Sequence, residues 1–291
     1  MPEPGTLRVV QLNAGTLLEP HWDRRRDEIV AWLERLDPDI VCLEEIWEDA
    51  RNPNTARWIV EAAPGRWHRV FGGHSLPVHV WPDASLHFGS AVLSRWPIDE
   101  HHVELLPPDG PFPWELVHAR TAGLDVFAVH LAAAPTQAPG RCRQVVALDD
   151  AVTRLSHPDA VCPFVFGEPS RDAMPPIIGG DFNAEPESDE IRFLCSLHVI
   201  DERAAFYQDA WRMAGEGPGY TQDWRTNAIA DEMNINRKRI DYVFVGDPFK
   251  RAGNAGRVLR AELAFHEPLT GIDASDHAGL VVDVVWPQRP S

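Results

Sequence analysis

The chain has 291 residues, with 27 lysines and arginines against 44 aspartates and glutamates, which gives a formal net charge of -17. Its 44% of hydrophobic and 24% of charged residues are typical of a globular protein and exclude collagen-like and fully disordered chains. The negative charge argues against a protein that holds nucleic acid by neutralising many phosphates, but it leaves room for a nuclease, because bound cations supply positive charge locally.

The elements of the N-terminal half are predicted from apolar runs and helical stripes. Residues 7–12 have the pattern of a strand, and a helix is expected between Asp23 and Pro38. Further strands are predicted at 39–43, 89–94 and 124–130. We expect the three arginines at 24–26 to lie on a solvated face of the first helix.

In the C-terminal half, a helix is predicted over 141–155 and another one beginning at Ser188. Strands are predicted at 176–180, 240–245 and 279–285. Strands outnumber helices, which favours an α/β (α+β) fold of two sheets with helices outside them. The segments richest in proline and glycine lie between the strand-like runs, and we expect them to be surface loops of a single domain, 1–291. These segments are 72–84, 106–114, 156–176 and 214–220.

No transmembrane segment is predicted, because no apolar run approaches the roughly 20 residues that cross a bilayer. The first residues, MPEPGTLRVVQLNAG, also lack the basic start and apolar stretch of a signal peptide. We therefore expect a cytoplasmic protein.

The four cysteines are Cys42, Cys142, Cys162 and Cys195, and none has the spacing of a zinc or redox motif. We expect buried, reduced side chains, with a Cys162–Cys195 disulfide as the open alternative.

Tryptophans in or beside the loops either pack those loops onto the core or form an apolar rim around a substrate cleft; they are Trp81, Trp96 and Trp114.

Polar side chains gather at the ends of the predicted strands. A carboxylate, amide or imidazole placed there must be solvated, paired or bound to a metal, because an unpaired buried charge is costly. Any one of these positions is compatible with ordinary turn chemistry. Together they predict a convergent site, and they are Asn13, Glu44, Glu45, His130, Asp181, Asn183, Asp241, Asp276 and His277.

The motifs around these residues, in their order along the chain, resemble the endonuclease/exonuclease/phosphatase superfamily of DNase I-like metal-dependent phosphoesterases. The resemblance implies a four-layer sandwich of two packed mixed β-sheets flanked by helices, with the active site at one end. It spans residues 9 to 285 and rests on VVQLNAGTL, PDIVCLEEIW, FGSAVLSRWPI, FAVHLA, RCRQ, IIGGDFNAEP, KRIDYVFVG and SDHAGLVVDV.

The resemblance also implies a divalent cation. Glu45 matches the family's glutamate ligand, Asn13 should lie beside the ion and orient the phosphate, and Asp276 stands where the family often places a further acid of the metal site. Oxygen ligands suit Mg²⁺, with Mn²⁺ as the expected substitute. Neighbouring side chains of a strand point to opposite faces, so only one of Glu44 and Glu45 should reach the ion. We expect Glu45 and keep Glu44 as the alternative.

The catalytic residues follow from the same resemblance. His277 matches the general base that draws a proton from the attacking water, and Asp241 would fix its tautomer. Asp181 would position or protonate reacting groups, Asn183 would donate to a phosphoryl oxygen, and His130 would donate to the phosphate as charge develops. The implied reaction is in-line attack of water on phosphorus.

Some residues bear on the substrate. Gly15 stands where AP endonucleases of this superfamily carry an aspartate, which argues against cleavage at abasic sites. Arg141, in the RCRQ motif, either reaches the substrate or forms a surface salt bridge. Thr221 and Asn227 resemble a TxD…N segment of sphingomyelinase-like and tyrosyl-DNA-phosphodiesterase-like members, with turn chemistry as the alternative. The basic run 237–239 either steers an anionic substrate or is a charged loop.

The function that the resemblance implies is a metal-dependent phosphoesterase acting on a small-molecule, nucleotide-like or lipid-headgroup phosphoester. The alternative among enzymes is a nuclease or DNA-repair phosphodiesterase, against which the acidity argues. A catalytically silent binding protein is a third hypothesis, disfavoured because every expected catalytic position is filled. No protein partner is implied.

Overall fold

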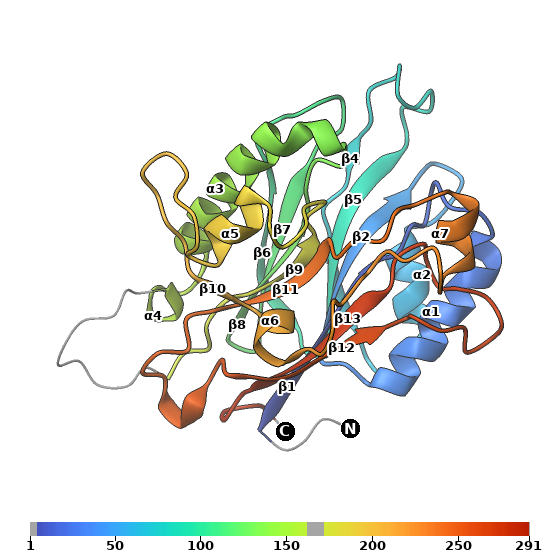
Figure 1. Cartoon of the computed structure of the whole chain (residues 1–291). Coiled ribbons are helices and arrows are strands. Elements are labelled where there is room, and N and C mark those ends of the chain that lie inside the picture. The colour runs from blue at the N-terminus through green and yellow to red at the C-terminus, as the bar shows by residue number, and fades with distance from the viewer. Residues whose placement is uncertain (1–4, 162–171, 291) are drawn as a thin grey trace.

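A computed structural model describes residues 5–161 and 172–290. Two mixed β-sheets pack face to face, and helices cover both outer faces (Figure 1). The first sheet has the strand order β12-β13-β1-β2-β5-β3, with β4 paired to β5. Its strands are β1 (Thr6–Asn13), β2 (Ile40–Glu48), β3 (His68–Phe71), β4 (His74–Ser75), β5 (His87–Ser94), β12 (Val258–Ala264) and β13 (Gly279–Val285).

The second sheet has the order β10-β11-β9-β8-β7-β6. In each sheet one central pair, β1–β2 or β8–β9, is parallel, and the other pairs are antiparallel. The strands of this sheet are β6 (Ile98–Leu105), β7 (Glu115–Thr121), β8 (Leu124–His130), β9 (Ile177–Asp181), β10 (Tyr207–Asp209) and β11 (Asp241–Gly246).

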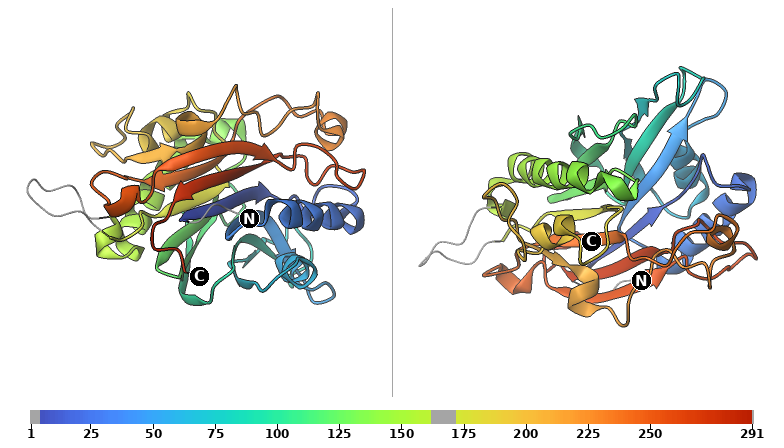
Figure 2. Two further views of the ribbon diagram at one scale, coloured as in Figure 1. Left: turned by 90° about the horizontal axis from the view of Figure 1, so that it is seen from below. Right: turned by 45° about the horizontal axis from the view of Figure 1, so that its top comes forward.

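The helices lie outside the sheets, so the four layers expected from the sequence are confirmed (Figures 1 and 2). α1 (Trp22–Leu36) and α2 (Thr55–Ala62) cover the first sheet, and α3 (Ala138–Leu155) and α5 (Asp189–Leu194) cover the second. The shorter helices are α4 (Pro158–Val161), α6 (Ala210–Ala214) and α7 (Ala228–Glu232). None of the described helices is both long and apolar enough to cross a membrane.

Alternation along the strands explains how one sheet serves two apolar layers. Val9 of β1 packs toward the second sheet, whereas Val10 packs toward α1, as the two-residue period of a strand requires. The sheets approach closely at Gly179, where a Cβ atom would lie 2.8 Å from the Cβ of Cys42. Glycine is needed there because any larger residue would push the sheets apart.

The predicted strands are confirmed, but the second one is longer than expected. β2 continues past Leu43 to Glu48, and its pairing with β5 shifts register between Leu43 and Ile46. The two glutamates therefore lie inside the strand at this irregularity, where Glu45 has a φ of 57°. A bulge of this kind redirects side chains locally.

The expected solvated arginine face is wrong for Arg25, which is fully buried, although Arg24 is exposed. The physical reason is that its guanidinium group donates hydrogen bonds to backbone carbonyls around the helix start. Trp114 is buried, and Trp81 and Trp96 are half-buried.

Among the cysteines within the described residues, Cys42 is fully buried, whereas Cys142 and Cys195 are partly exposed free thiols. Cys162 lies outside the described residues, and the alternative Cys162–Cys195 disulfide lies there with it.

Candidate active site

Strand register brings the predicted residues together at one end of the two sheets. His130 ends β8, Asp181 ends β9 and Asp241 begins β11, and the pairing sets His130 and Asp241 on either side of Asp181. In the facing sheet, Asn13 ends β1 and pairs with Glu44 of β2. The polar groups therefore gather where the apolar space between the sheets ends.

His277 and Asp241 form a buried pair across the two sheets. Nδ1 of His277, in the loop before β13, lies 2.8 Å from Oδ2 of Asp241. The amide of Gln222 donates to Nε2 of His277 at 2.9 Å, which leaves the ring proton on Nδ1, toward Asp241. Burial lowers the pKa of His277, and the charges of Asp241 and Asp276 outweigh burial and raise that pKa well above its ordinary value. The contact with Gln222 opposes this rise, because it requires an Nε2 that carries no proton.

The second oxygen of Asp241 is also held. Nε2 of Gln11, on β1, donates to Oδ1 of Asp241 at 2.9 Å and to Oε2 of Glu44 at 2.7 Å. Glu44 is fully buried, and burial raises the pKa of its carboxyl well above the ordinary value. Glu44 therefore faces the space between the sheets and supports Asp241 through Gln11.

Asn13 bridges Glu45 and Asp181. Its Nδ2 donates to Oε1 of Glu45 and to Oδ2 of Asp181, both at 3.0 Å. Its Oδ1 accepts a hydrogen bond from the backbone N–H of Gly15 at 3.1 Å. The amide thus fixes the relative position of two carboxylates that come from different sheets.

Asp181 has neighbours on both sides. The backbone N–H of Asn183 donates to its Oδ1 at 2.8 Å, and Nε2 of His130 lies 3.6 Å from its Oδ2. Burial, followed by the charge of Asp241, raises the pKa of Asp181 to about 7. Burial, followed by the charge of His277, lowers the pKa of His130 to about 3, so this ring is neutral. The Asn183 side chain donates to the carbonyl of Leu131 at 3.0 Å, which turns its amide away from the carboxylates.

A group of carboxylates lies on the other side of Asn13. Within the described chain, Oε2 of Glu45 and Oε2 of Glu19 are shielded from water and accept no hydrogen bond. Burial, followed by the charges of Glu19 and Asp276, raises the pKa of Glu45 to about 8. Unpartnered buried carboxylate oxygens are the donor set that a hard divalent cation prefers, so these residues fit such an ion.

Asp181, Asp241 and His277 also satisfy a distance criterion for a metal group, since one ligand atom from each lies within 4.8 Å of the others. Both oxygens of Asp241 are already engaged, however, by Gln11 and by His277. The group around Glu45 differs, because Glu45 and Glu19 each have an oxygen that accepts no hydrogen bond within the described chain.

Arg141 neither forms the expected surface salt bridge nor has its donors free for a substrate. It is buried, and its Nε donates to Glu190 at 2.9 Å, while Nη1 donates to the carbonyls of Ala132 and Ala134. The ion pair with an acid is formed, but inside the protein and not on its surface. It positions the chain that follows His130.

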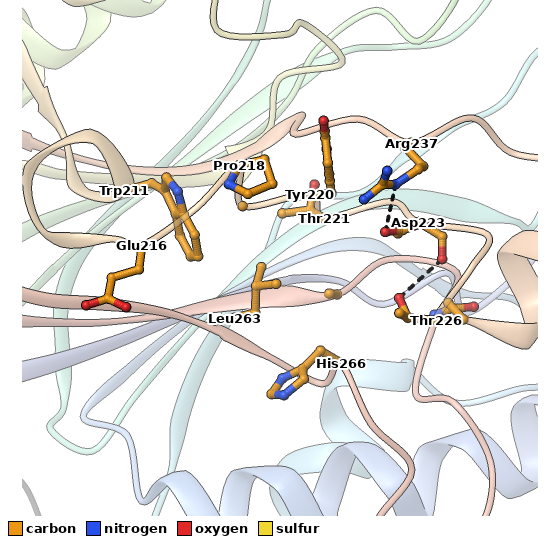
Figure 3. A pocket seen from close by; sticks show the side chains of 13 residues that line it. Trp211, Glu216, Pro218, Tyr220, Thr221, Asp223, Thr226, Arg237, Leu263 and His266 are labelled. Atoms are coloured by element: carbon orange, nitrogen blue, oxygen red, sulfur yellow. Dashed lines mark hydrogen bonds and ion pairs between the residues drawn. The ribbon is translucent and has the colours of Figure 1, made fainter.

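Segment 219–223 separates the catalytic pair from a cavity of about 280 Å³. Figure 3 shows Trp211 and Pro218 at one side of this cavity, and Tyr220 with Arg237 at the other. Arg237 pairs with Asp223 at 2.9 Å and lies over the ring of Tyr220.

The other predicted groups of this region are held within the fold. Arg239 is buried in a two-pronged pair with Asp209. Thr221 accepts the backbone N–H groups of Ile240 and Asp241, and Asn227 caps α7. Turn and cap chemistry therefore accounts for Thr221 and Asn227.

Three residues of the site are not predicted from the sequence, namely Gln11, Glu19 and Gln222. Gln11 had a signal, because it lies two residues before Asn13 and so on the same face of β1, in a run that is otherwise apolar. Gln222 lies inside a segment that the sequence did single out. Glu19 is in a loop, where a carboxylate is unremarkable.

Comparisons with known proteins identify a family for the chain. Residues 10–277 match the Endonuclease/Exonuclease/phosphatase family. A search of curated protein sequences finds no significant match.

Solved structures with the same fold cover nearly the whole chain. An endonuclease/exonuclease/phosphatase from Beutenbergia cavernae has a TM-score of 0.67 and 23% identity, over 97% of this chain and 72% of that one. TDP2 from D. rerio, complexed with a single-stranded DNA product, has a TM-score of 0.67 and 18% identity, over 96% and 98% of the two chains. The catalytic domain of human Nocturnin with bound sulfate has a TM-score of 0.62 and 18% identity, over 98% and 95%. Because the family match extends over residues 10–277, which is most of the sequence, the chain belongs to the Endonuclease/Exonuclease/phosphatase family.

Proposed function

We propose that this protein is a divalent-cation-dependent phosphoesterase that hydrolyses a phosphoester by in-line attack of water. Membership of the family supports a hydrolase of this class. The observation that carries the proposal is the buried Asp241–His277 pair, in which Nε2 of His277 lies 4.0 Å from Asp181 and 3.7 Å from Asp276. An imidazole oriented by a carboxylate beside a cluster of acids is suited to general base catalysis next to a cation.

In this proposal His277 takes the proton from the attacking water at Nε2, and Asp241 stabilises the resulting imidazolium through Nδ1. Gln222 holds Nε2 in the substrate-free state and gives way to the water. Asp181 and the neutral ring of His130 face the same space and donate to the phosphoryl group as charge develops. Asn183 acts through its backbone N–H on Asp181.

The cation would be held by Glu45 and Asp276, with Asn13 orienting Glu45. Mg²⁺ fits such oxygen ligands, and Mn²⁺ is the expected substitute. When bound, the ion neutralises negative charge on the phosphoryl oxygens. Each glutamate has one unpartnered oxygen. Glu45 is preferred because the charges of Glu19 and Asp276 act on it, whereas Glu44 binds Gln11 and faces Asp241 and Asp181 between the sheets.

The proposed substrate is a small-molecule, nucleotide-like or lipid-headgroup phosphoester. Arg141 is not proposed to bind it, because the donor groups of Arg141 are engaged inside the protein. A nuclease or DNA-repair phosphodiesterase is the second candidate, favoured by the similarity to TDP2 with its DNA product. The net charge of -17 weighs against it, because broad phosphate binding needs basic surface.

Hydrolysis of bis-p-nitrophenyl phosphate and p-nitrophenyl phosphate, with Mg²⁺ or Mn²⁺ present, tests the proposal. We expect cation-dependent turnover that His277→Ala reduces by orders of magnitude, while His101→Ala, at an exposed position of β6, leaves it unchanged. Glu45→Gln should weaken activation by the cation more than Glu44→Gln. Nicking of plasmid DNA would promote the nuclease, and no turnover on a broad phosphoester panel would favour a binding protein.

A further inference from the structure

The loop between β1 and α1, residues 14–21, places one more carboxylate at the site. Glu19 is only 9% exposed, and its Oε2 accepts no hydrogen bond from any described residue. A buried carboxylate oxygen without a donor is unfavourable unless another group compensates it. Its environment therefore indicates which kind of group would compensate it.

The Glu19 side chain lies against the backbone that Asn13 holds. A Cβ atom on Gly15 would stand 2.6 Å from Oε2 of Glu19, so only glycine leaves room for this carboxylate. The N–H of Gly15 donates to Asn13, which in turn donates to Glu45. The hydrogen bonds from Gly15 to Asn13 and from Asn13 to Glu45 thus connect the backbone beside Glu19 with the carboxylate of Glu45.

The carboxylates of Glu19, Glu45 and Asp276 repel one another. Burial, and next the charge of Asp276, raises the pKa of Glu19, and the charge of Glu19 is the largest contribution after burial to the raised pKa of Glu45. In the part of the chain that the structure describes, no lysine or arginine forms a hydrogen bond or ion pair with these three carboxylates, and the imidazole in range is that of His277, whose Nε2 lies 3.7 Å from Oδ2 of Asp276.

Arg25 is the nearby cation, and it does not neutralise the cluster by direct contact. Its guanidinium donates to the carbonyl oxygens of Ala14, Gly15, Pro20, Glu19 and Ala274. Its charge still acts on the acids at longer range, since Glu19, Asp276 and Glu45 each favour its charged form. A divalent cation would offset the repulsion that remains among the three carboxylates.

We propose that Glu19 is a further carboxylate of the cation site and holds the ion together with Glu45 and Asp276. This inference rests on the cation dependence in the proposed function. With a third acid in place, the site binds a divalent ion before any phosphoester arrives, because the protein alone supplies enough negative oxygen.

The test is a Mn²⁺ titration of the full, substrate-free chain, followed by electron paramagnetic resonance of the free ion. Glu19→Gln keeps the shape of the side chain and removes its charge, and it should raise the Kd by about tenfold or more, as should Glu45→Gln. Glu48→Gln, farther along β2, is the matched control and should leave the Kd unchanged. Without ions, the Tm of Glu19→Gln should equal or exceed that of the wild type, because repulsion is relieved.

Three outcomes would overturn the inference. A Kd for Glu19→Gln within twofold of the wild type, with Glu45→Gln impaired, would remove Glu19 from the site and leave the proposed function standing. A lower ion-free Tm with unchanged affinity would make Glu19 a structural residue only. If the wild type bound no Mn²⁺, or Glu45→Gln bound it normally, the cation site of the proposed function would fall as well.

Discussion

At the scale of single residues, the site depends on amides that hold carboxylates in place. Gln11 fixes Asp241 and Asn13 fixes Asp181, and each of these contacts joins a strand of one sheet to a strand of the other. Charged groups held in this way lose little freedom when a substrate binds, which favours catalysis by preorganised groups. The orientation of His277 is therefore set before any substrate is present.

Asp241→Asn tests this orientation directly. The amide has the shape of the carboxylate but no charge, so it cannot stabilise a protonated His277, and we expect kcat to fall by roughly 10²- to 10⁴-fold. KM should change little, because Asp241 lies behind the imidazole. Steady-state kinetics on bis-p-nitrophenyl phosphate measure the effect, with circular dichroism as the control for folding. A kcat within threefold of the wild type would remove Asp241 from the mechanism.

At the scale of elements, α1 anchors the two loops that carry the cation site. Arg25 binds carbonyls of the loop before the helix and of Ala274, two residues before Asp276. One turn further on, the buried Glu28 accepts hydrogen bonds from the backbone of Leu269 and Thr270. The helix thus joins segments that lie far apart in the sequence.

Arg25→Lys should show the cost of losing this anchor. A lysine retains the charge but lacks the planar fork, so several buried carbonyls lose their donor, and the free energy of unfolding should fall by about 3 kcal/mol. Urea unfolding measures the change, and Arg24→Lys, on the exposed face of the same helix, is the matched control. Equal stability of the two variants would contradict an anchoring role for Arg25.

Strand β4 depends on a buried acid of the opposite sheet. Glu115 of β7 accepts the N–H groups of Gly73 and Ser90 and contacts Nδ1 of His74. The hydrogen bond with Glu115, more than its charge, raises the pKa of His74 above 6.5, although partial burial works against it. A raised folded-state pKa contributes stability that is fully present below the unfolded value and is lost as pH rises through the folded value.

His74→Gln should therefore destabilise the protein most in acid. The difference in the free energy of unfolding between wild type and variant should be largest below about pH 6 and shrink as the pH rises past the raised pKa. Urea unfolding at several pH values gives this difference, with His101→Gln on the exposed part of β6 as the control. A difference that grows with pH would show that His74 is not held charged by Glu115.

The elements differ in how well the sequence predicts them, and the reason is burial. Strands with a continuous apolar run, such as β8 and β9, were predicted because both of their faces are covered. β6 was missed because its run IDEHHVEL is mostly exposed and has no apolar pattern. Glu19 could not be assigned to the site, because only the three-dimensional course of its loop brings it to Asn13.

At the scale of the whole molecule, the acidity constrains the substrate. An anionic phosphoester must approach a protein with a formal net charge of -17. Two arginines of the segment that leads to Asp241 are engaged, Arg237 by Asp223 and Arg239 by Asp209. Long-range attraction of a polyanion is therefore not expected, whereas a small substrate is held by the contacts of the site itself.

If the proposed activity holds, salt should affect it in the opposite direction from that of a nucleic-acid-binding enzyme. Raising NaCl from about 20 mM to about 200 mM shortens the screening length from roughly 20 Å to 7 Å, so repulsion between the protein and bis-p-nitrophenyl phosphate weakens. We expect kcat/KM to rise up to a few-fold at saturating Mg²⁺, with kcat unchanged, because screening acts on the encounter and not on the buried pair. A protein that binds through many phosphate contacts loses about 10³- to 10⁵-fold in affinity between 50 and 200 mM salt. The nuclease would therefore be favoured over the small-molecule phosphoesterase by two results together. A DNA substrate would be turned over faster than the small diester, and its kcat/KM would fall steeply with salt.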